Sequence, residues 1–125
     1  MGFSSVIPPG VNWVLLMQTL EPIGFEVRGA ENGRVAINHA MRWQPDLILM
    51  DMQMPEMDGY EATRKIREFN KDVIIIAQTA YALPGDREKA LEAGCNDYIP
   101  KPIAKENLFE IINKYFPKEE KKKIN

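Results

Sequence analysis

Residues 46–59 read Asp46-Leu47-Ile48-Leu49-Met50-Asp51-Met52-Gln53-Met54-Pro55-Glu56-Met57-Asp58-Gly59. Four consecutive apolar residues lead directly into an acid, and a segment that contains Pro, Asp and Gly follows. An apolar run of this length between chain-breaking residues is typical of a strand buried on both faces, as in a parallel sheet covered by helices. The pattern therefore places Asp51 at the carboxyl end of a strand, where open α/β sheets bind ligands. On this stretch alone, an aspartate that caps a helix or a turn is the simpler alternative.

The size and composition predict one domain. We expect residues 1–117 of the 125 to form it and residues 118–125 to be a charged tail or linker. A chain with 45% apolar and 27% charged residues is not expected to be disordered or to span a membrane. Its net charge of −2 gives no reason to expect direct nucleic-acid binding. The single Cys95 and the lack of a targeting segment predict a cytoplasmic location.

The rest of the chain alternates between strand and helix patterns. Strand signals occur at 3–7, 25–28, 47–50, 73–77 and 97–99, and helical patterns at 11–20, 36–41, 58–66, 86–93 and 108–115. Alternation of this kind requires right-handed crossovers. The sequence therefore predicts an α/β fold with a doubly wound, five-stranded parallel sheet and five helices in three α/β/α layers.

Three chemically different groups follow three of these strands. Asp51, Thr79 and Lys101 each come at a carboxyl end, and these ends share one edge of a parallel sheet. Such a site can accept a phosphoryl group, with the Asp carboxylate as nucleophile, the Lys ammonium to neutralise charge and the Thr hydroxyl to donate a hydrogen bond. Each residue alone has an ordinary structural explanation, so the prediction depends on their joint placement.

Over roughly residues 11–116 the sequence resembles the receiver domains of two-component response regulators. The resemblance is carried by four stretches: residues 24–33 (Gly24-Phe25-Glu26-Val27 and Ala30-Glu31-Asn32-Gly33), residues 45–59, residues 75–80 and residues 93–102. The segment Asp58-Gly59-Tyr60-Glu61-Ala62-Thr63 further resembles the receivers of hybrid sensor histidine kinases.

The resemblance implies a flavodoxin-like fold and a phosphoprotein of a two-component phosphorelay. A histidine kinase or a histidine phosphotransfer domain would pass a phosphoryl group to Asp51. The chain would not be an enzyme beyond assisting its own phosphorylation and dephosphorylation. Magnesium would be held by two acids after the first strand, by Asp51 and by the backbone carbonyl of Gln53, and Thr79 and Tyr98 would act as switch residues.

The first ten residues depart from this pattern. Alignment from Asn12 puts Ile7 and Pro8 where the family has its acidic pair, and neither side chain can bind a metal. We therefore expect magnesium binding to be impaired and phosphorylation to be slow or absent. Ser4 and Ser5 also interrupt the first strand, which should cost stability or leave a gap for another chain, as in a homodimer.

Three explanations of residues 1–10 stay open: a degenerate receiver, a boundary artefact and a redesigned segment. The abrupt change at Val11 favours the last two. An alternative function is a phosphorylation-independent interaction module that works through the surface around Tyr98. A flavin carrier is disfavoured because no Ser/Thr/Gly-rich loop follows the first strand.

Overall fold

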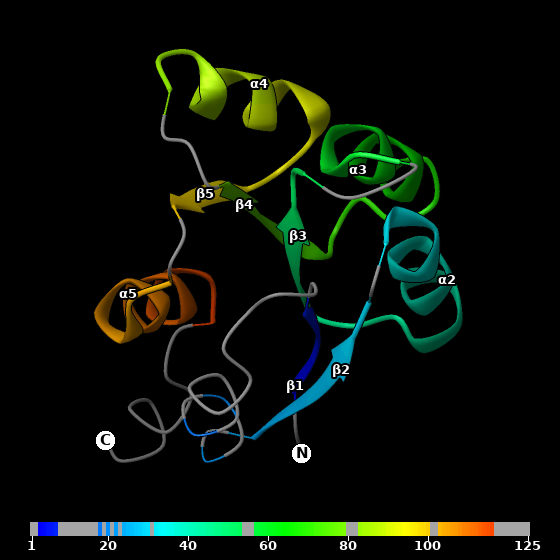
Figure 1. Ribbon diagram of the computed structural model, residues 1–125. Coiled ribbons are helices and arrows are strands. Elements are labelled where there is room, and N and C mark those ends of the chain that lie inside the picture. Colours follow the sequence, from blue (N-terminus) through cyan, green and yellow to red (C-terminus); the bar gives the residue numbers. More distant parts are fainter. Residues whose placement is uncertain are drawn as a thin grey trace.

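The computed structural model describes residues 3–7, 18, 20, 22, 24–30, 32–53, 57–79, 83–100 and 103–116 of the chain. Strands and helices alternate along it (Figure 1). The elements are β1 (Phe3–Ile7), β2 (Phe25–Gly29), α2 (Gly33–Trp43), β3 (Leu47–Asp51), α3 (Gly59–Arg67), β4 (Ile74–Thr79), α4 (Asp86–Ala93), β5 (Asp97–Pro100) and α5 (Lys105–Tyr115).

The strands form one five-stranded sheet in the order β2-β1-β3-β4-β5, and all neighbouring strands are parallel. The predicted doubly wound parallel sheet is therefore confirmed. Consecutive strands β1 and β2 lie on one side of β3, and β4 and β5 lie on the other, so the winding direction reverses beside β1 and β3. Ligands bind at the carboxyl ends of strands near such a reversal.

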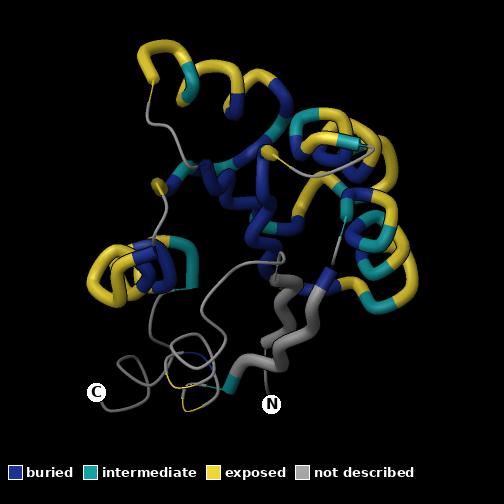
Figure 2. The backbone as a smooth tube through the Cα atoms, in the orientation of Figure 1, coloured by how far each residue is buried: buried dark blue, intermediate teal, exposed yellow. Residues whose placement is uncertain are grey.

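The sheet separates two apolar clusters. One cluster joins β3 and β4 to α2, α3 and α4 through residues such as Ile48, Ala62 and Ile75. The other joins the same strands to α5 through residues such as Leu49 and Leu108. Figure 2 shows β3 and β4 buried inside, with exposed residues on the outer faces of the helices. Every residue of β3 is buried, as the apolar run before Asp51 predicts.

Local signals explain how the helices begin and end. The Asn32 side chain accepts a hydrogen bond from the Val35 N–H and is the N-cap of α2. The Asp58 side chain accepts from the Glu61 N–H at 2.9 Å and is the N-cap of α3. Gly94 adopts a φ of 118° after α4, the left-handed conformation of a glycine C-cap.

Two predictions need correction. Ser4 and Ser5 do not interrupt the first strand, because the backbone of Phe3–Ile7 pairs continuously with β2. The fourth strand extends to Thr79, since Gln78 and Thr79 pair with β5.

Several predictions fall on residues that the structure does not describe. The helix predicted at 11–20 lies mostly outside the described residues, although Leu20 is fully buried in the cluster against α5. Four helices are therefore described where five were predicted. Pro8, Lys101 and the tail 118–125 also lie outside the described residues. Within the described residues, no helix is long and apolar enough to cross a membrane.

Candidate functional site

Asp51 is the last residue of β3, and its side chain is buried at the carboxyl edge of the sheet. Only 3% of the residue is exposed. Its Oδ1 accepts a hydrogen bond of 2.9 Å from the backbone N–H of Gln53, so the chain turns at the end of the strand and one carboxylate oxygen is oriented by an amide. A buried carboxylate requires compensating groups, and this location makes Asp51 a candidate site residue.

The chain after β3 brings Thr79 to the same edge. The Gln53 side chain donates from Nε2 to Thr79 Oγ1 at 3.2 Å, and the Met52 N–H donates to the Gln78 carbonyl at 3.0 Å. Thr79 is 1% exposed at the end of β4. The structure therefore brings Asp51 and Thr79 together through Gln53. Their roles as nucleophile and phosphoryl ligand stay predictions.

Tyr98 lies on β5, two strands away from Asp51. It is in register with Ala77 and packs, half-buried, against the cluster formed with α2, α3 and α4. Pro100 ends β5 in register with Thr79, so the chain continues from there towards Lys101, which is outside the described residues. At the other side of the site, β1 ends at Ile7.

Gly59 holds α3 close to the site, and sequence reasoning did not single it out. A Cβ added at Gly59 would collide with the backbone oxygen of Asp51 and the Cε of Met52. The Gly59 N–H donates to the Met52 carbonyl at 3.3 Å. Only glycine allows this approach, so α3 fixes the backbone that carries Asp51.

Gln78 follows the strand predicted at 73–77, and the sequence alone assigns it no role. It is directly in register with Asp51 on the neighbouring strand. It is 2% exposed, and its side-chain Oε1 is buried with no hydrogen-bond partner in the part of the chain that is described. The signal that could have identified it is a polar side chain within a doubly buried strand, beside a buried acid.

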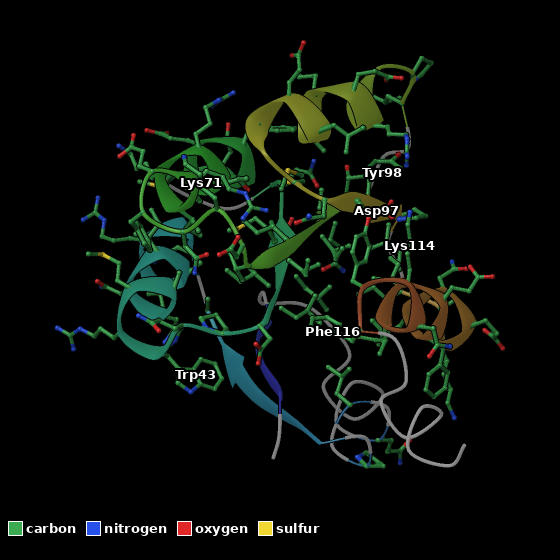
Figure 3. All side chains as sticks on the ribbon, turned by 180° about the vertical axis from the view of Figure 1, so that it is seen from behind. Trp43, Lys71, Asp97, Tyr98, Lys114 and Phe116 are labelled. Carbon is green, nitrogen blue, oxygen red and sulfur yellow. The ribbon has the colours of Figure 1, made fainter. Side chains whose placement is uncertain are left out.

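A second buried acid, Asp97, begins β5 and is surrounded by cationic and hydroxyl groups (Figure 3). Its Oδ2 accepts from Lys114 Nζ and from the Tyr115 hydroxyl, both at 3.0 Å, and its Oδ1 lies 3.4 Å from Arg87. Burial alone would raise the pKa of Asp97, but the hydrogen bonds from Lys114, the Tyr98 N–H and Tyr115 hold this pKa below its ordinary value. This acid fastens α5 to the sheet.

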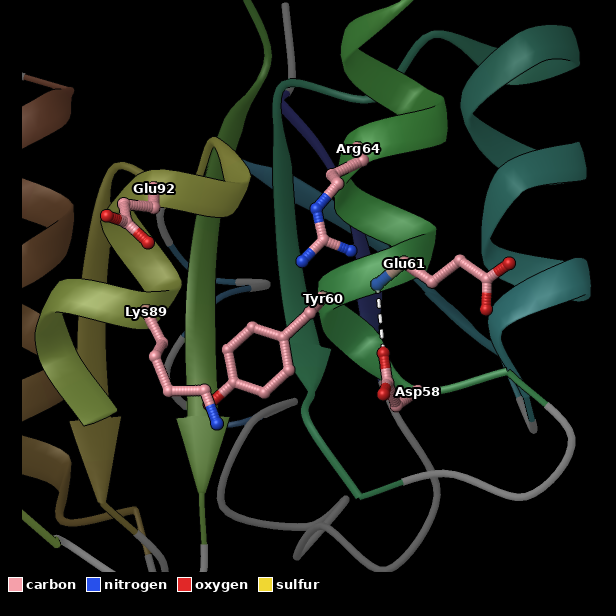
Figure 4. Close-up of a pocket in the computed structure, with 6 residues that line it drawn as sticks. All are labelled: Asp58, Tyr60, Glu61, Arg64, Lys89 and Glu92. Carbon is pink, nitrogen blue, oxygen red and sulfur yellow. Dashed lines mark hydrogen bonds between the residues drawn. The ribbon is translucent and has the colours of Figure 1, made fainter. Parts of the chain in front are cut away.

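One cleft lies away from Asp51 and Thr79. It has a volume of about 780 Å³, lies between α3 and α4, and is lined by Asp58, Tyr60, Glu61, Arg64, Lys89 and Glu92 (Figure 4). Lys89 Nζ lies 5.2 Å from the centroid of the Tyr60 ring. Burial, followed by the charge of Asp86, raises the pKa of Tyr60, so this phenol stays protonated at neutral pH.

The parallel sheet, its order and the buried acid at its carboxyl edge define a flavodoxin-like α/β domain with a candidate site at the reversal of winding. The chain belongs to the response regulator receiver domain family, whose family profile matches residues 11–113. This match confirms the predicted resemblance and with it a phosphorelay receiver of two-component signalling.

Three known proteins illustrate the relationship. The polar-differentiation response regulator DivK of Brucella anthropi is 37% identical over 107 residues, covering 84% of this chain and 87% of DivK. The co-crystal structure of the Saccharomyces cerevisiae histidine phosphotransfer protein Ypd1 with the receiver domain of its downstream response regulator Ssk1 contains a match at 32% identity and a TM-score of 0.80, over 91% of this chain and 88% of that chain.

The third is the receiver domain of a sensor histidine kinase from Pseudomonas aeruginosa. It is 38% identical with a TM-score of 0.76, over 92% of this chain and 98% of that chain, and its crystal structure contains a magnesium ion coordinated in the active-site cleft.

The described residues fit a magnesium ion, with one carboxylate and neutral oxygen atoms. The Asp51 carboxylate, the Gln53 backbone carbonyl and the unpartnered Gln78 Oε1 are hard donors near the carboxyl edge. Magnesium is commonly held by one or two carboxylates together with water and substrate oxygens. Among the described residues, no three His, Cys, Asp or Glu side chains form a metal cluster.

Proposed function

We propose that Asp51 accepts a phosphoryl group from the phosphohistidine of a histidine kinase or a histidine phosphotransfer domain. The observation that carries this proposal is the buried Asp51 carboxylate, which is oriented by the Gln53 N–H and connected through the Gln53 side chain to Thr79. The partner class is supported by the complex of Ypd1 with the Ssk1 receiver.

The transfer forms one bond and breaks another. A carboxylate oxygen of Asp51 attacks the phosphorus atom, and the phosphorus–nitrogen bond breaks with its electron pair going to the imidazole. Burial of Asp51 favours a nucleophile without a water shell, and the Gln53 N–H keeps its carboxylate in place. In this proposal the Thr79 hydroxyl donates to a phosphoryl oxygen, and Lys101, which follows β5 in the sequence, supplies positive charge.

Magnesium, when bound, offsets the negative charge that the donor and the acceptor bring together. Asp51 and the Gln53 backbone carbonyl would hold it. Because Ile7 and Pro8 supply no carboxylate, we propose that this affinity is lower than in a site with three acids, and that phosphorylation is correspondingly slow.

The chain acts as a switch and not as an enzyme on an external substrate. A phosphoryl group that interacts more favourably with one arrangement of Thr79 and Tyr98 shifts the population towards it. We place this signalling in the cytoplasm, where histidine kinases present their phosphohistidine, and we assign no direct nucleic-acid or membrane contact to the domain.

The test is the intact mass of the full chain after incubation with acetyl phosphate, with and without magnesium. We expect a magnesium-dependent adduct of one phosphoryl group, and its complete loss in Asp51→Asn. Circular dichroism confirms that the variant is folded. An adduct that persists in Asp51→Asn, or no adduct on the folded wild-type chain at any magnesium concentration, contradicts the proposal.

A second candidate function is a phosphorylation-independent interaction module, which could include a homodimer. A groove of about 350 Å³ beside Tyr98 favours it, with Pro100, Asn107 and Lys114 among its lining residues. Size-exclusion chromatography with light scattering, before and after phosphorylation, separates the two functions. Self-association that is equal in both states favours the interaction module.

A further inference from the structure

The Gln78 side chain is an unusual feature of an otherwise apolar strand. Burial of β4 is complete from Ile75 to Thr79, and Gln78 is 2% exposed. Buried polar atoms are nearly always hydrogen-bonded, yet Gln78 Oε1 has no partner in the described part of the chain. Burying an amide oxygen without a hydrogen bond destabilises the folded state, so its retention requires an explanation.

The register places this amide on the same face of the sheet as the Asp51 side chain. Asp51 and Gln78 are paired across β3 and β4. Side chains alternate between faces, and Leu47 and Leu49 of β3 share the cluster on the α5 side with Ile76 of β4. Two residues after Leu49 and after Ile76, the Asp51 and Gln78 side chains therefore start from that same side.

The two side chains also lie at the same level along the strand direction. Paired residues on adjacent strands lie about 4.8 Å apart, and both of these residues are at the carboxyl edge of the sheet. The long Gln78 side chain can therefore present its amide beside the Asp51 carboxylate. The pair consists of one anionic and one neutral oxygen donor on neighbouring strands.

We propose that Gln78 belongs to the phosphoacceptor site and supplies its side-chain carbonyl oxygen to the divalent cation. The inference rests on the proposed function of Asp51 and names an additional ligand for it. A neutral amide oxygen suits magnesium, which prefers hard oxygen atoms. Ligation also satisfies Oε1, so the cost of burying this atom in the unliganded protein is removed when the ion binds.

The test is a magnesium titration of the full chain by isothermal calorimetry, without any phosphodonor. Gln78→Met keeps the length of the side chain and removes the oxygen, and we expect its magnesium affinity to fall on the order of tenfold or more. Gln78→Glu provides a carboxylate at the same place, and we expect it to bind magnesium on the order of tenfold more tightly than the wild type. Gln18→Met, which makes the same exchange at an exposed residue, should leave the affinity unchanged.

Two further measurements separate the possible failures. Asp51→Asn should abolish binding, which shows that the measured ion is at this site. Gln78→Met removes the buried Oε1 atom that has no hydrogen-bond partner in the described part of the chain, so the variant should stay folded, with a thermal unfolding temperature close to that of the wild type without magnesium.

Equal affinity of Gln78→Met and wild type, or weaker binding by Gln78→Glu, overturns the role of Gln78 while Asp51 keeps its proposed function. If the wild-type chain binds no magnesium but still forms the adduct on Asp51, the ligand role alone is wrong. If it neither binds the ion nor forms the adduct, both inferences are wrong.

Discussion

Asp51 and Asp97 are the two buried acids among the described residues, and their surroundings are very different. Asp97 lies among Lys114, Arg87 and Tyr115, which are all parts of the same folded chain. Asp51 is oriented by a backbone amide, and its paired neighbour on β4 is Gln78, a neutral residue with an unpartnered oxygen. A buried acid neutralised by its own fold stabilises that fold. The neutral Gln78 oxygen beside Asp51 is a donor suited to a cationic ligand.

The largest expected effect concerns the backbone support of Asp51. Gly59→Ala would push the new methyl group into the Asp51 carbonyl, and we expect it to lower the free energy of unfolding by about 3 kcal/mol. The measurement is urea unfolding followed by circular dichroism. Gly85→Ala is the matched control, because no atom lies within 4 Å of its added Cβ and only its φ of +89° opposes the change. We expect the control to cost about 1 kcal/mol. If the two substitutions lowered the free energy of unfolding equally, the close contact between Gly59 and the Asp51 backbone would not be the cause of the effect.

The next effect tests whether Asp97 is purely structural. We expect Asp97→Asn to lower the free energy of unfolding at pH 7 by about 1.5 kcal/mol, a modest value because Lys114 and Arg87 are 59% and 54% exposed. It should leave the phosphoryl adduct on Asp51 unchanged.

The pH dependence of this effect has a defined sign. Because folding lowers the pKa of Asp97, its stabilisation is present above the unfolded pKa of about 4 and is lost as the pH falls through the lower folded value. The difference between wild type and Asp97→Asn should therefore disappear in acid. Urea unfolding at a series of pH values measures it, and a difference that stays constant into acid would show that lost charge is not its cause.

The smallest effect concerns the hydrogen bond between Gln53 and Thr79. Gln53 is exposed, so we expect the bond to contribute about 0.5 kcal/mol to the stability of the unphosphorylated state. A double-mutant cycle with Gln53→Ala and Thr79→Val gives this coupling energy directly. A coupling energy of zero would mean that the hydrogen bond between Gln53 and Thr79 does not contribute to stability. The surroundings of Asp51 would then differ even more from those of Asp97, whose hydrogen bonds stabilise the fold.

Much of this fold follows from short apolar patterns in the sequence. The run before Asp51 and the run from Val73 both become buried strands, because five alternations of strand and helix require a covered parallel sheet. Pairing in the sheet then overrides local patterns. Ser4 and Ser5 continue β1 because β2 offers a complete partner for its backbone.

The candidate site was predictable only in part. Asp51 and Thr79 could be located because each follows an apolar run, and such runs end at the same edge. Gln78 could not be assigned to the site in this way, since its importance depends on the register that pairs it with Asp51 and on the unpartnered state of its oxygen. The close approach at Gly59 likewise depends on how α3 packs against the end of β3.

The pairing of β1 divides the sheet unequally. All five residues of β1 are in register with β2, whereas the described register with β3 covers Ser5 and Val6. Strand β3, in contrast, is in register with β4 along its full length, from Leu47 to Asp51. The strand that carries the acid is therefore paired along its whole length with a later part of the chain. In folding terms, the backbone that positions Asp51 is complete only once β4, which follows it by more than twenty residues, has paired with it.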